Sequence, residues 1–95
     1  MEIHKKVYLF LQTIPHGKVV SYKTIADKFH IHARTVGIIM RKNKYPDTYP
    51  CYKVLASDGS LGGYSGTGGT EEKIRRLQKD GIEIVDNKIH KKYFL

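Results

Sequence analysis

The sequence predicts a mainly α-helical fold with a small β hairpin, in which two short helices form a helix-turn-helix. Apolar residues recur at spacings of three and four over residues 2–13, 22–29 and 33–42, as they do in helices that bury one face. The pair Asp58-Gly59 separates two short apolar segments and is a strong hairpin signal. With 95 residues, 40% of them hydrophobic, the chain is long enough for one core, so we expect residues 1–95 to form a single domain.

The first predicted helix covers residues 2–13 and ends before a turn at Pro15 and Gly17. Its apolar stripe is formed by Ile3, Val7, Phe10, Leu11 and Ile14. The helix is therefore expected to cover the core with one face.

The next two predicted helices are separated by a turn at residues 30 and 31. Ser21 is a suitable N-cap for the helix over residues 22–29 because its hydroxyl can accept a backbone N–H. The residues expected to face inward are Ile25, Ala26, Phe29, Ala33, Val36, Ile39 and Met40. In a helix-turn-helix the second helix enters a DNA groove, and cations near its ends meet phosphates or bases. A plain helical hairpin in a small core would show the same pattern, so this alternative stays open.

The residue types in the rest of the chain predict an irregular loop, one further helix and a second small hairpin. Residues 43–50 contain two prolines and should form an irregular loop, and glycines crowd residues 62–69. Thr70 can cap a last helix that buries Ile74 and Leu77 and ends at Gly81. Residues 82–89 are expected to form a second small hairpin, and the last five residues to pack or fray.

The charge and the cysteine count narrow the class of partner. Seventeen Lys and Arg against nine Asp and Glu give a formal net charge of +8, which favours nucleic acid as partner; the alternative is that the charge only keeps the protein soluble. One cysteine cannot form an internal disulfide, so a reduced intracellular setting is expected. Residues 1–13 interrupt their apolar residues with charge, and neither a signal peptide nor a membrane partner is expected.

No cofactor is expected from the motifs. The glycine-rich stretch has neither a Walker pattern nor a strand-associated dinucleotide fingerprint. The histidines do not form a metal-ligand spacing with the cysteine, so no metal is predicted; they are His4, His16, His30, His32 and His90.

Five segments in a characteristic order add up to a family resemblance. They are Ile-Pro-His-Gly-Lys-Val-Val-Ser-Tyr at 14–22, Ala-Arg-Thr-Val-Gly at 33–37, Asn43, Pro-Cys-Tyr-Lys-Val at 50–54 and Asp-Gly-Ser-Leu-Gly-Gly-Tyr-Ser-Gly at 58–66. Over roughly residues 3–82 the chain resembles the C-terminal DNA-binding domain of the O6-alkylguanine-DNA alkyltransferases. The resemblance implies a winged helix-turn-helix-like alkyltransferase fold and, as partner, double-stranded DNA containing alkylated guanine.

The resemblance also implies roles for residues of the two short helices. Arg34 matches the arginine finger that fills the gap left by a flipped nucleotide, and a long cationic side chain suits that task. Tyr22 matches the tyrosine that pushes against the 3′ phosphate and helps to rotate the base. The remaining expected DNA-binding residues are Thr35, Gly37, Arg41 and Lys53.

In the family the cysteine is the nucleophile that takes the alkyl group from guanine O6, and Cys51 matches it. Asn43 matches an asparagine whose amide bonds to backbone between the reading helix and the active-site turn. Tyr64 and Ser65 match residues that cover the flipped base. The full expected lesion pocket is Asn43, Pro46, Pro50, Val54, Tyr64, Ser65 and Gly66.

The chain departs from the family beside the cysteine. The usual Pro-Cys-His-Arg supplies a histidine that takes the thiol proton through a water while a distant Glu orients it; here Tyr52 and Lys53 follow Cys51, and Asp80 stands at the Glu position. A tyrosine is a poor base at neutral pH. A relay through Tyr52, water and Asp80 is one expectation, and a lowering of the thiol pKa by nearby Lys53 is another.

Two functions therefore stay open. One is a single-turnover enzyme, a methylated-DNA-protein-cysteine S-methyltransferase, in which Cys51 accepts the alkyl group irreversibly. The other is an alkyltransferase-like lesion sensor that binds O6-alkylguanine without transfer and recruits nucleotide excision repair proteins; single-domain relatives of this type usually replace the cysteine, which this chain keeps. A helix-turn-helix with a merely structural cysteine is a third interpretation. We expect a monomer that is cytoplasmic, and nucleoid-associated in a prokaryote, or nuclear.

Overall fold

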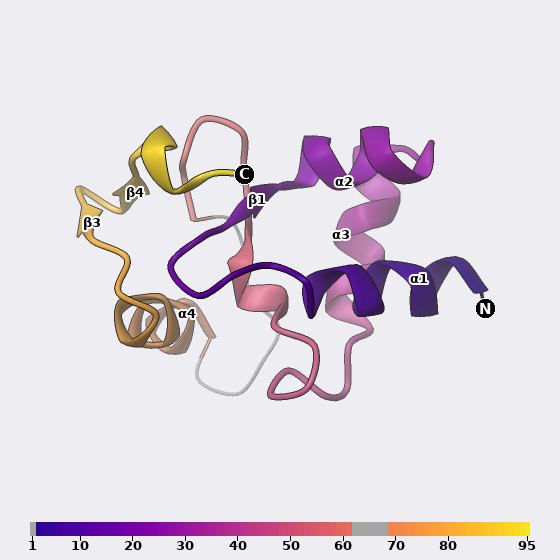
Figure 1. Cartoon of the computed structure of the whole chain (residues 1–95), viewed down its shortest axis with the longest axis horizontal. Coiled ribbons are helices and arrows are strands. Elements are labelled where there is room, and N and C mark those ends of the chain that lie inside the picture. The colour runs from indigo at the N-terminus through magenta and orange to yellow at the C-terminus, as the bar shows by residue number, and fades with distance from the viewer. Residues whose placement is uncertain (1, 62–68) are drawn as a thin grey trace.

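The predicted helices of the first half are present in the computed structural model, which describes residues 2–61 and 69–95 (Figure 1). Helix α1 covers Glu2–Leu11 and buries Val7 and Leu11 completely. Helix α2 covers Tyr22–Phe29, and the Ser21 hydroxyl accepts the backbone N–H of Thr24 at 3.0 Å, as the N-cap prediction requires. Helix α2 ends at His30, which adopts a left-handed conformation with φ 57°.

Helix α3 covers Ala33–Arg41 and packs against α2, completing the helix-turn-helix. Val36, Ile39 and Met40 are buried as predicted, whereas Ala33 is exposed because it begins the helix. His32 caps the helix through Nδ1, which accepts the backbone N–H of Arg34 at 3.0 Å.

The hairpin predicted around Asp58-Gly59 is wrong in its strand pairing. Strand β2 (Val54–Leu55) pairs in parallel with strand β1 (Val20–Ser21), with Val20 opposite Val54. The turn itself forms, since Ala56 donates to Ser60 O at 3.2 Å and Gly59 has φ 89°. The local turn signal was correct, but the ladder partner of β2 lies more than thirty residues earlier in the chain.

The last predicted helix and the tail hairpin are both present. Helix α4 covers Gly69–Lys79, so it begins one residue before the predicted cap at Thr70. Strands β3 (Ile84–Val85) and β4 (Lys88–Ile89) pair antiparallel across Asp86 and Asn87, which both have positive φ. A 3-10 turn, η2 (Lys91–Tyr93), follows, and the chain end packs rather than frays: Leu95 N donates to Val19 O at 2.9 Å.

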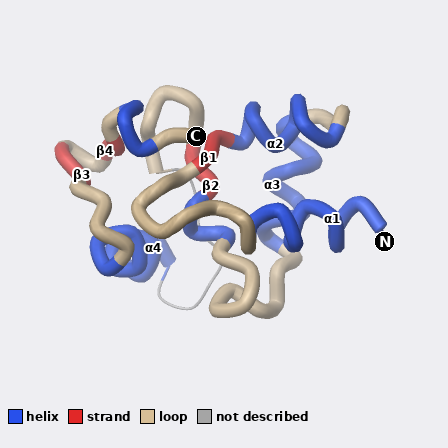
Figure 2. The backbone as a smooth tube through the Cα atoms, viewed as in Figure 1, coloured by secondary structure: helices blue, strands red, loops and turns tan. Residues whose placement is uncertain are grey.

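The core consists of two apolar clusters, and residues in or next to the β1–β2 pair contribute to both. Figure 2 shows where this strand pair lies along the backbone. The first cluster lies among α1, α2 and α3 and contains Cys51; the second lies beneath α4 and the C-terminal hairpin. Val54 and Leu55 of β2 join the first and the second cluster respectively, and so do Val20 of β1 and Val19, the residue just before that strand. The described part of the chain is therefore mainly helical with small strand pairs, as predicted.

None of the helices in residues 2–61 and 69–95 combines the length and apolar character that a bilayer crossing requires.

Candidate active site and DNA-reading face

Cys51 opens a short 3-10 turn, η1 (Cys51–Lys53), directly after the irregular loop. Its side chain belongs to the first apolar cluster, and the residue is only 6% exposed. Its backbone N–H donates to Tyr49 O at 2.7 Å. The turn thus holds the single thiol at the edge of the core between α3 and β2.

Asn43 connects the end of α3 to this turn. Its amide Nδ2 donates to Tyr49 O at 2.8 Å, and its Oδ1 accepts the backbone N–H of Tyr45 at 3.0 Å. The same side chain hydrogen-bonds the Cys51 sulfur in the sense that favours thiolate. Asn43 therefore lies where the resemblance expects it, bound to backbone between the reading helix and Cys51.

The environment of the Cys51 thiol contains opposing influences. Burial raises the pKa of Cys51, whereas the Asn43 hydrogen bond and the positive charges of Lys73 and Arg76 lower it; the net direction is upward. In the absence of DNA the Cys51 side chain is therefore a protonated thiol at neutral pH, and it must lose this proton before it can act as a nucleophile.

Lys73 of α4 is a site residue that the sequence reasoning missed. Its side chain is fully buried, and Nζ donates to Val54 O at 3.0 Å and to Leu61 O at 2.6 Å. Burial lowers the pKa of Lys73 to about 8. The available signal was a lysine four residues before the inward-facing Leu77, hence on the apolar face of the predicted helix.

Asp80, at the end of α4, lies among groups that bind both of its carboxylate oxygens. Oδ2 accepts Lys53 Nζ and the backbone N–H of Gly17, each at 2.9 Å, and Oδ1 lies 3.0 Å from His16 Nδ1. Burial alone would raise the pKa of Asp80, but the Lys53 and Gly17 hydrogen bonds outweigh it, so the pKa is lowered. His16 was not predicted as a partner, since it lies 64 residues away in the sequence.

The prediction of a DNA contact by Lys53 is corrected by its position. Lys53 is 4% exposed, and Nζ donates to Pro15 O at 2.9 Å in addition to its ion pair with Asp80. An ammonium held in the interior by these groups does not reach a phosphate at the surface. Lys53 instead attaches the Cys51 turn to the segment after α1.

Tyr52 and Asp80 line one surface depression of about 310 Å³, together with Pro46 and Pro50. Tyr52 is half-buried and packs against the second apolar cluster, so the consecutive residues Cys51 and Tyr52 point into different clusters. Lys53, Gly17 and His16 bind the Asp80 carboxylate. The position of this carboxylate therefore does not single out Tyr52 as the partner of Asp80 in a relay. The relay stays a prediction.

The predicted DNA-contacting residues of α2 and α3 differ in their exposure. Arg34 and Arg41 are exposed at the two ends of α3, and Thr35 is half-exposed. A Cβ added at Gly37 would lie 3.8 Å from an Arg41 guanidinium nitrogen, which places that side chain beside the glycine. Tyr22, at the start of α2, has its pKa raised by burial and by the charge of Cys51 and lowered by Arg41. Tyr22 thus lies within the electrostatic reach of both the thiol and α3.

Of the remaining residues predicted to line the lesion pocket, some lie in the part of the chain that the structure describes and some do not. Val54 is fully buried, and its carbonyl is the Lys73 acceptor described above. Tyr64, Ser65 and Gly66 lie outside the described residues.

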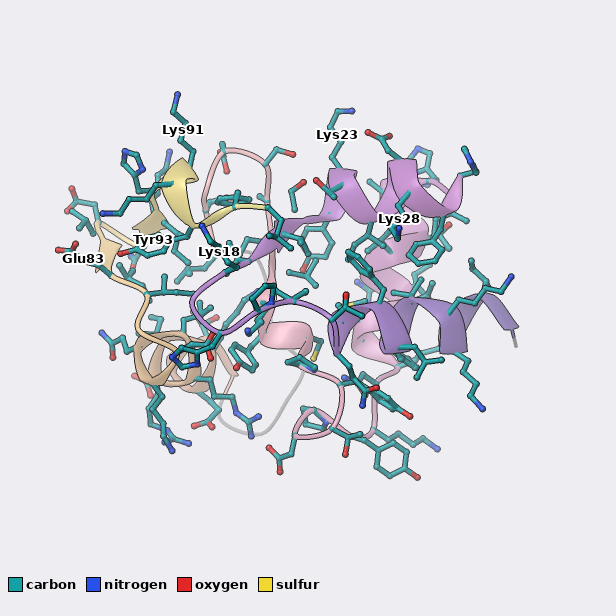
Figure 3. All side chains as sticks on the ribbon, viewed as in Figure 1. Lys18, Lys23, Lys28, Glu83, Lys91 and Tyr93 are labelled. Carbon is teal, nitrogen blue, oxygen red and sulfur yellow. The ribbon has the colours of Figure 1, made fainter. Side chains whose placement is uncertain are left out.

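Positive charge is spread well beyond α3 (Figure 3). Lys23 and Lys28 lie on α2, and Lys91 lies at the other end of the molecule in η2. Lys23 pairs with Asp27 at 2.9 Å, whereas Lys28 lies over the Phe10 ring. Net charge alone therefore does not indicate which face meets an anionic partner. Among residues 2–61 and 69–95, no three His, Cys, Asp or Glu side chains gather into a metal-binding group.

The fold and the site define a helix-turn-helix DNA-binding domain with a buried cysteine turn behind its second helix. The family model described as "6-O-methylguanine DNA methyltransferase, DNA binding domain" matches residues 2–82, and the chain belongs to this family.

Relatives with curated names support the assignment. The chain is 42% identical over 96 residues to the bifunctional methyltransferase/endonuclease of Picrophilus torridus, covering 99% of this chain and 32% of that protein. It is 44% identical over 85 residues to the methylated-DNA--protein-cysteine methyltransferase of Pyrobaculum aerophilum, covering 90% and 55%. The chain thus spans between a third and about half the length of these relatives.

Two solved structures show the same fold. Schizosaccharomyces pombe Atl1, in complex with damaged DNA containing O6-carboxymethylguanine, has a TM-score of 0.87 at 28% identity, with 99% of this chain and 94% of that chain covered. The O6-methylguanine-DNA methyltransferase of Pyrococcus kodakaraensis has a TM-score of 0.78 at 37% identity, with 86% and 47% covered. The chain is therefore similar both to a methyltransferase and to Atl1.

Proposed function

We propose that this domain binds double-stranded DNA containing O6-alkylguanine, flips the damaged base out of the duplex and transfers the alkyl group irreversibly to Cys51. The observation that carries the proposal is the position of the thiol: it opens the η1 turn behind α3, with an Asn43 hydrogen bond and two α4 cations that favour its ionised form. A soft sulfur nucleophile suits the removal of an alkyl group from an ether-like oxygen.

The transfer balances without a cofactor. The Cys51 thiol gives its proton to water, and the thiolate sulfur forms a bond with the alkyl carbon. The bond from that carbon to guanine O6 breaks and leaves its electron pair on the base, which takes one proton from water. The products are an S-alkyl cysteine and unmodified guanine, so each molecule acts once.

The DNA roles are those that the family resemblance implies, and the exposure of Arg34 and Arg41 at the two ends of α3 supports them. Arg34 fills the space left by the flipped nucleotide, and Tyr22 acts on the adjacent phosphate. Base flipping requires a few kcal/mol of unstacking, least at a damaged pair, which favours the lesion over normal DNA. Arg41 adds a phosphate contact at the other end of α3.

A second candidate is a non-catalytic lesion sensor that passes the complex to nucleotide excision repair proteins. Two observations favour it: the fold is similar to that of Atl1, with a TM-score of 0.87, and the Asp80 carboxylate, which a proton relay would use, is already bound by Lys53, Gly17 and His16.

Intact mass spectrometry separates the two functions. Duplex DNA carrying O6-methylguanine should convert the protein to a species heavier by one methyl in place of one hydrogen, with Cys51→Ser and an undamaged duplex as controls. Lesion-selective binding without a mass change would establish the sensor instead. Equal binding to damaged and undamaged duplex, again without a mass change, would contradict both functions.

A further inference from the structure

The buried ammonium of Lys73 is one of the two α4 cations that favour the Cys51 thiolate, and its hydrogen bonds connect it to the turn that holds the thiol. Its two carbonyl acceptors, on Val54 and Leu61, belong to segments on either side of the turn at residues 56–60. Val54 also closes η1, because its N–H donates to Cys51 O. Lys73 therefore connects α4 to the end of the turn that begins with the thiol.

The charge of Lys73 also acts on the thiol. Among the cations that favour the Cys51 thiolate, Lys73 has a stronger influence than Arg76. Arg76 lies at 2.8 Å from Glu72 and at 2.7 Å from Asp47, and these carboxylates offset its charge. With a pKa of about 8, Lys73 is still protonated at pH 7 despite its burial.

We propose that Lys73 is a positioning residue that holds the Cys51 turn through Val54 and supplies the internal positive charge that favours the Cys51 thiolate. This inference rests on the proposed transfer to Cys51, and it assigns to a buried lysine the activation that a histidine beside the cysteine supplies elsewhere in the family. The ammonium transfers no proton in this scheme. It stabilises the negative charge on sulfur after the thiol proton has left to water.

Other titratable groups that face Cys51 do not supply this charge. Tyr8 of α1 and Tyr22 of α2 both have raised pKa values and are neutral at pH 7. Asn43 contributes a hydrogen bond without charge. The ammonium of Lys53, two residues along η1, is paired with Asp80. Among the charged groups around the thiol, Lys73 therefore contributes most to favouring the thiolate.

The test measures the thiol in the absence of DNA. Cys51 is the single cysteine, so the rate of mass gain with iodoacetamide reports its thiolate at each pH. Lys73→Met keeps the length and apolar stem of the side chain but removes the charge. At pH 7 it should react about threefold to tenfold more slowly than the native protein, because the thiolate fraction falls faster than its nucleophilicity rises, and the pH profile should move upward.

Leu77→Ala is the matched control, since it loosens the same buried face of α4 without changing a charge. Its pH profile should stay in place even if its stability falls. An unshifted profile in Lys73→Met, or an equal shift in Leu77→Ala, would overturn the proposal. Because no lesion is present, these outcomes do not depend on whether transfer from DNA occurs.

A second measurement does not require a variant at Lys73. The charge of ionised Cys51 raises the pKa of Lys73, and the coupling between the two groups is reciprocal. In protein with carbon-13-labelled lysine, the Lys73 titration midpoint seen by NMR should therefore be higher in Cys51→Asp, whose carboxylate is ionised near pH 8, than in Cys51→Ser, which carries no charge. Equal midpoints in these two variants would show that Lys73 does not respond to a charge at position 51 and would overturn the proposal even if Lys73→Met fails to fold.

Discussion

Helices α3 and α4 are both amphipathic and both carry exposed cations, but α4 also places one cation, Lys73, in the core. Helix α3 keeps Arg34 and Arg41 exposed at its two ends, whereas α4 directs Lys73 into the core and ends at the buried ion pair of Asp80 with Lys53. Exposed arginines can meet phosphates, while a buried ammonium can act only on groups inside the protein. The comparison teaches that a basic composition serves two purposes here, an external one on α3 and an internal one on α4.

The largest effect on the α4 side is expected from Asp80→Ala. The substitution leaves the buried Lys53 ammonium without its carboxylate and removes the acceptor of the Gly17 N–H. Removing one member of a buried ion pair is strongly destabilising, and we expect a loss of about 3 kcal/mol in the free energy of unfolding by urea. His16→Ala is the control: His16 is 74% exposed in its side chain and should cost less than about 1 kcal/mol. A similar small loss for Asp80→Ala would contradict the internal role.

The same ion pair predicts a direction for the pH dependence of stability. The folded-state pKa of Asp80 lies below its usual 3.8, so the carboxylate contributes stability above about pH 4, and this contribution is lost as the pH falls through the folded-state value. Glu72, whose pKa the Arg75 and Arg76 hydrogen bonds lower to about 2, acts in the same direction. Urea midpoints measured between pH 6 and pH 3, roughly the range of carboxylate titration, should fall less in Asp80→Asn than in the native protein. Parallel curves would exclude Asp80 as a source of the acid sensitivity.

On the α3 side, Arg34→Ala should leave stability within about 0.5 kcal/mol because the residue is exposed. Binding to a duplex with O6-methylguanine should weaken by about tenfold at moderate salt, since the flipped state loses the side chain that fills the gap. Arg75→Ala on α4 is the control, an arginine with 59% of its side chain exposed. If both variants bind equally well, α3 is not the reading helix.

The smallest effect is expected from Ser21→Ala, which removes the N-cap that starts α2 and supports α3. The loss of the 3.0 Å bond from Thr24 N should reduce the free energy of unfolding by about 1 kcal/mol without changing the pH profile of Cys51. A shift in that profile would show that the thiol also depends on the order of the reading helices.

Local patterns were sufficient for most of the fold. The residues 22–29 helix, its Ser21 cap and the tail turn at Asp86-Asn87 are set by neighbours within a few positions, and all three are present. The pairing of β2 was not predictable in this way. The Asp58-Gly59 signal describes a turn, whereas the partner strand β1 is selected by the burial of Val54 and Leu55 between two clusters. That residues 1–95 form a single domain stays a prediction.

The residues of the candidate site could be predicted from the sequence where they belong to a family motif. How deeply each side chain is buried could not. Cys51, Asn43 and Arg34 were named from sequence; Arg34 lies at the start of α3, Asn43 follows its end and Cys51 opens η1, and their roles stay predictions. Lys53 was assigned to DNA and lies in the core, because a lysine beside a motif cysteine gives no indication of which way it points. Asp80 binds both His16 and Gly17, although Gly17 lies 63 positions from it in the sequence.

By itself the sequence determined the class of this protein: its helices, its DNA-reading pair and the single thiol in a family motif depend on residue identity and short spacing. Tertiary structure decided the environment of that thiol. Folding brought Lys73 into the core beside the end of η1 and attached Lys53 to Asp80. The physical reason is that the effect of a charge depends on its burial and its neighbours in space, and neither is set by its distance along the chain.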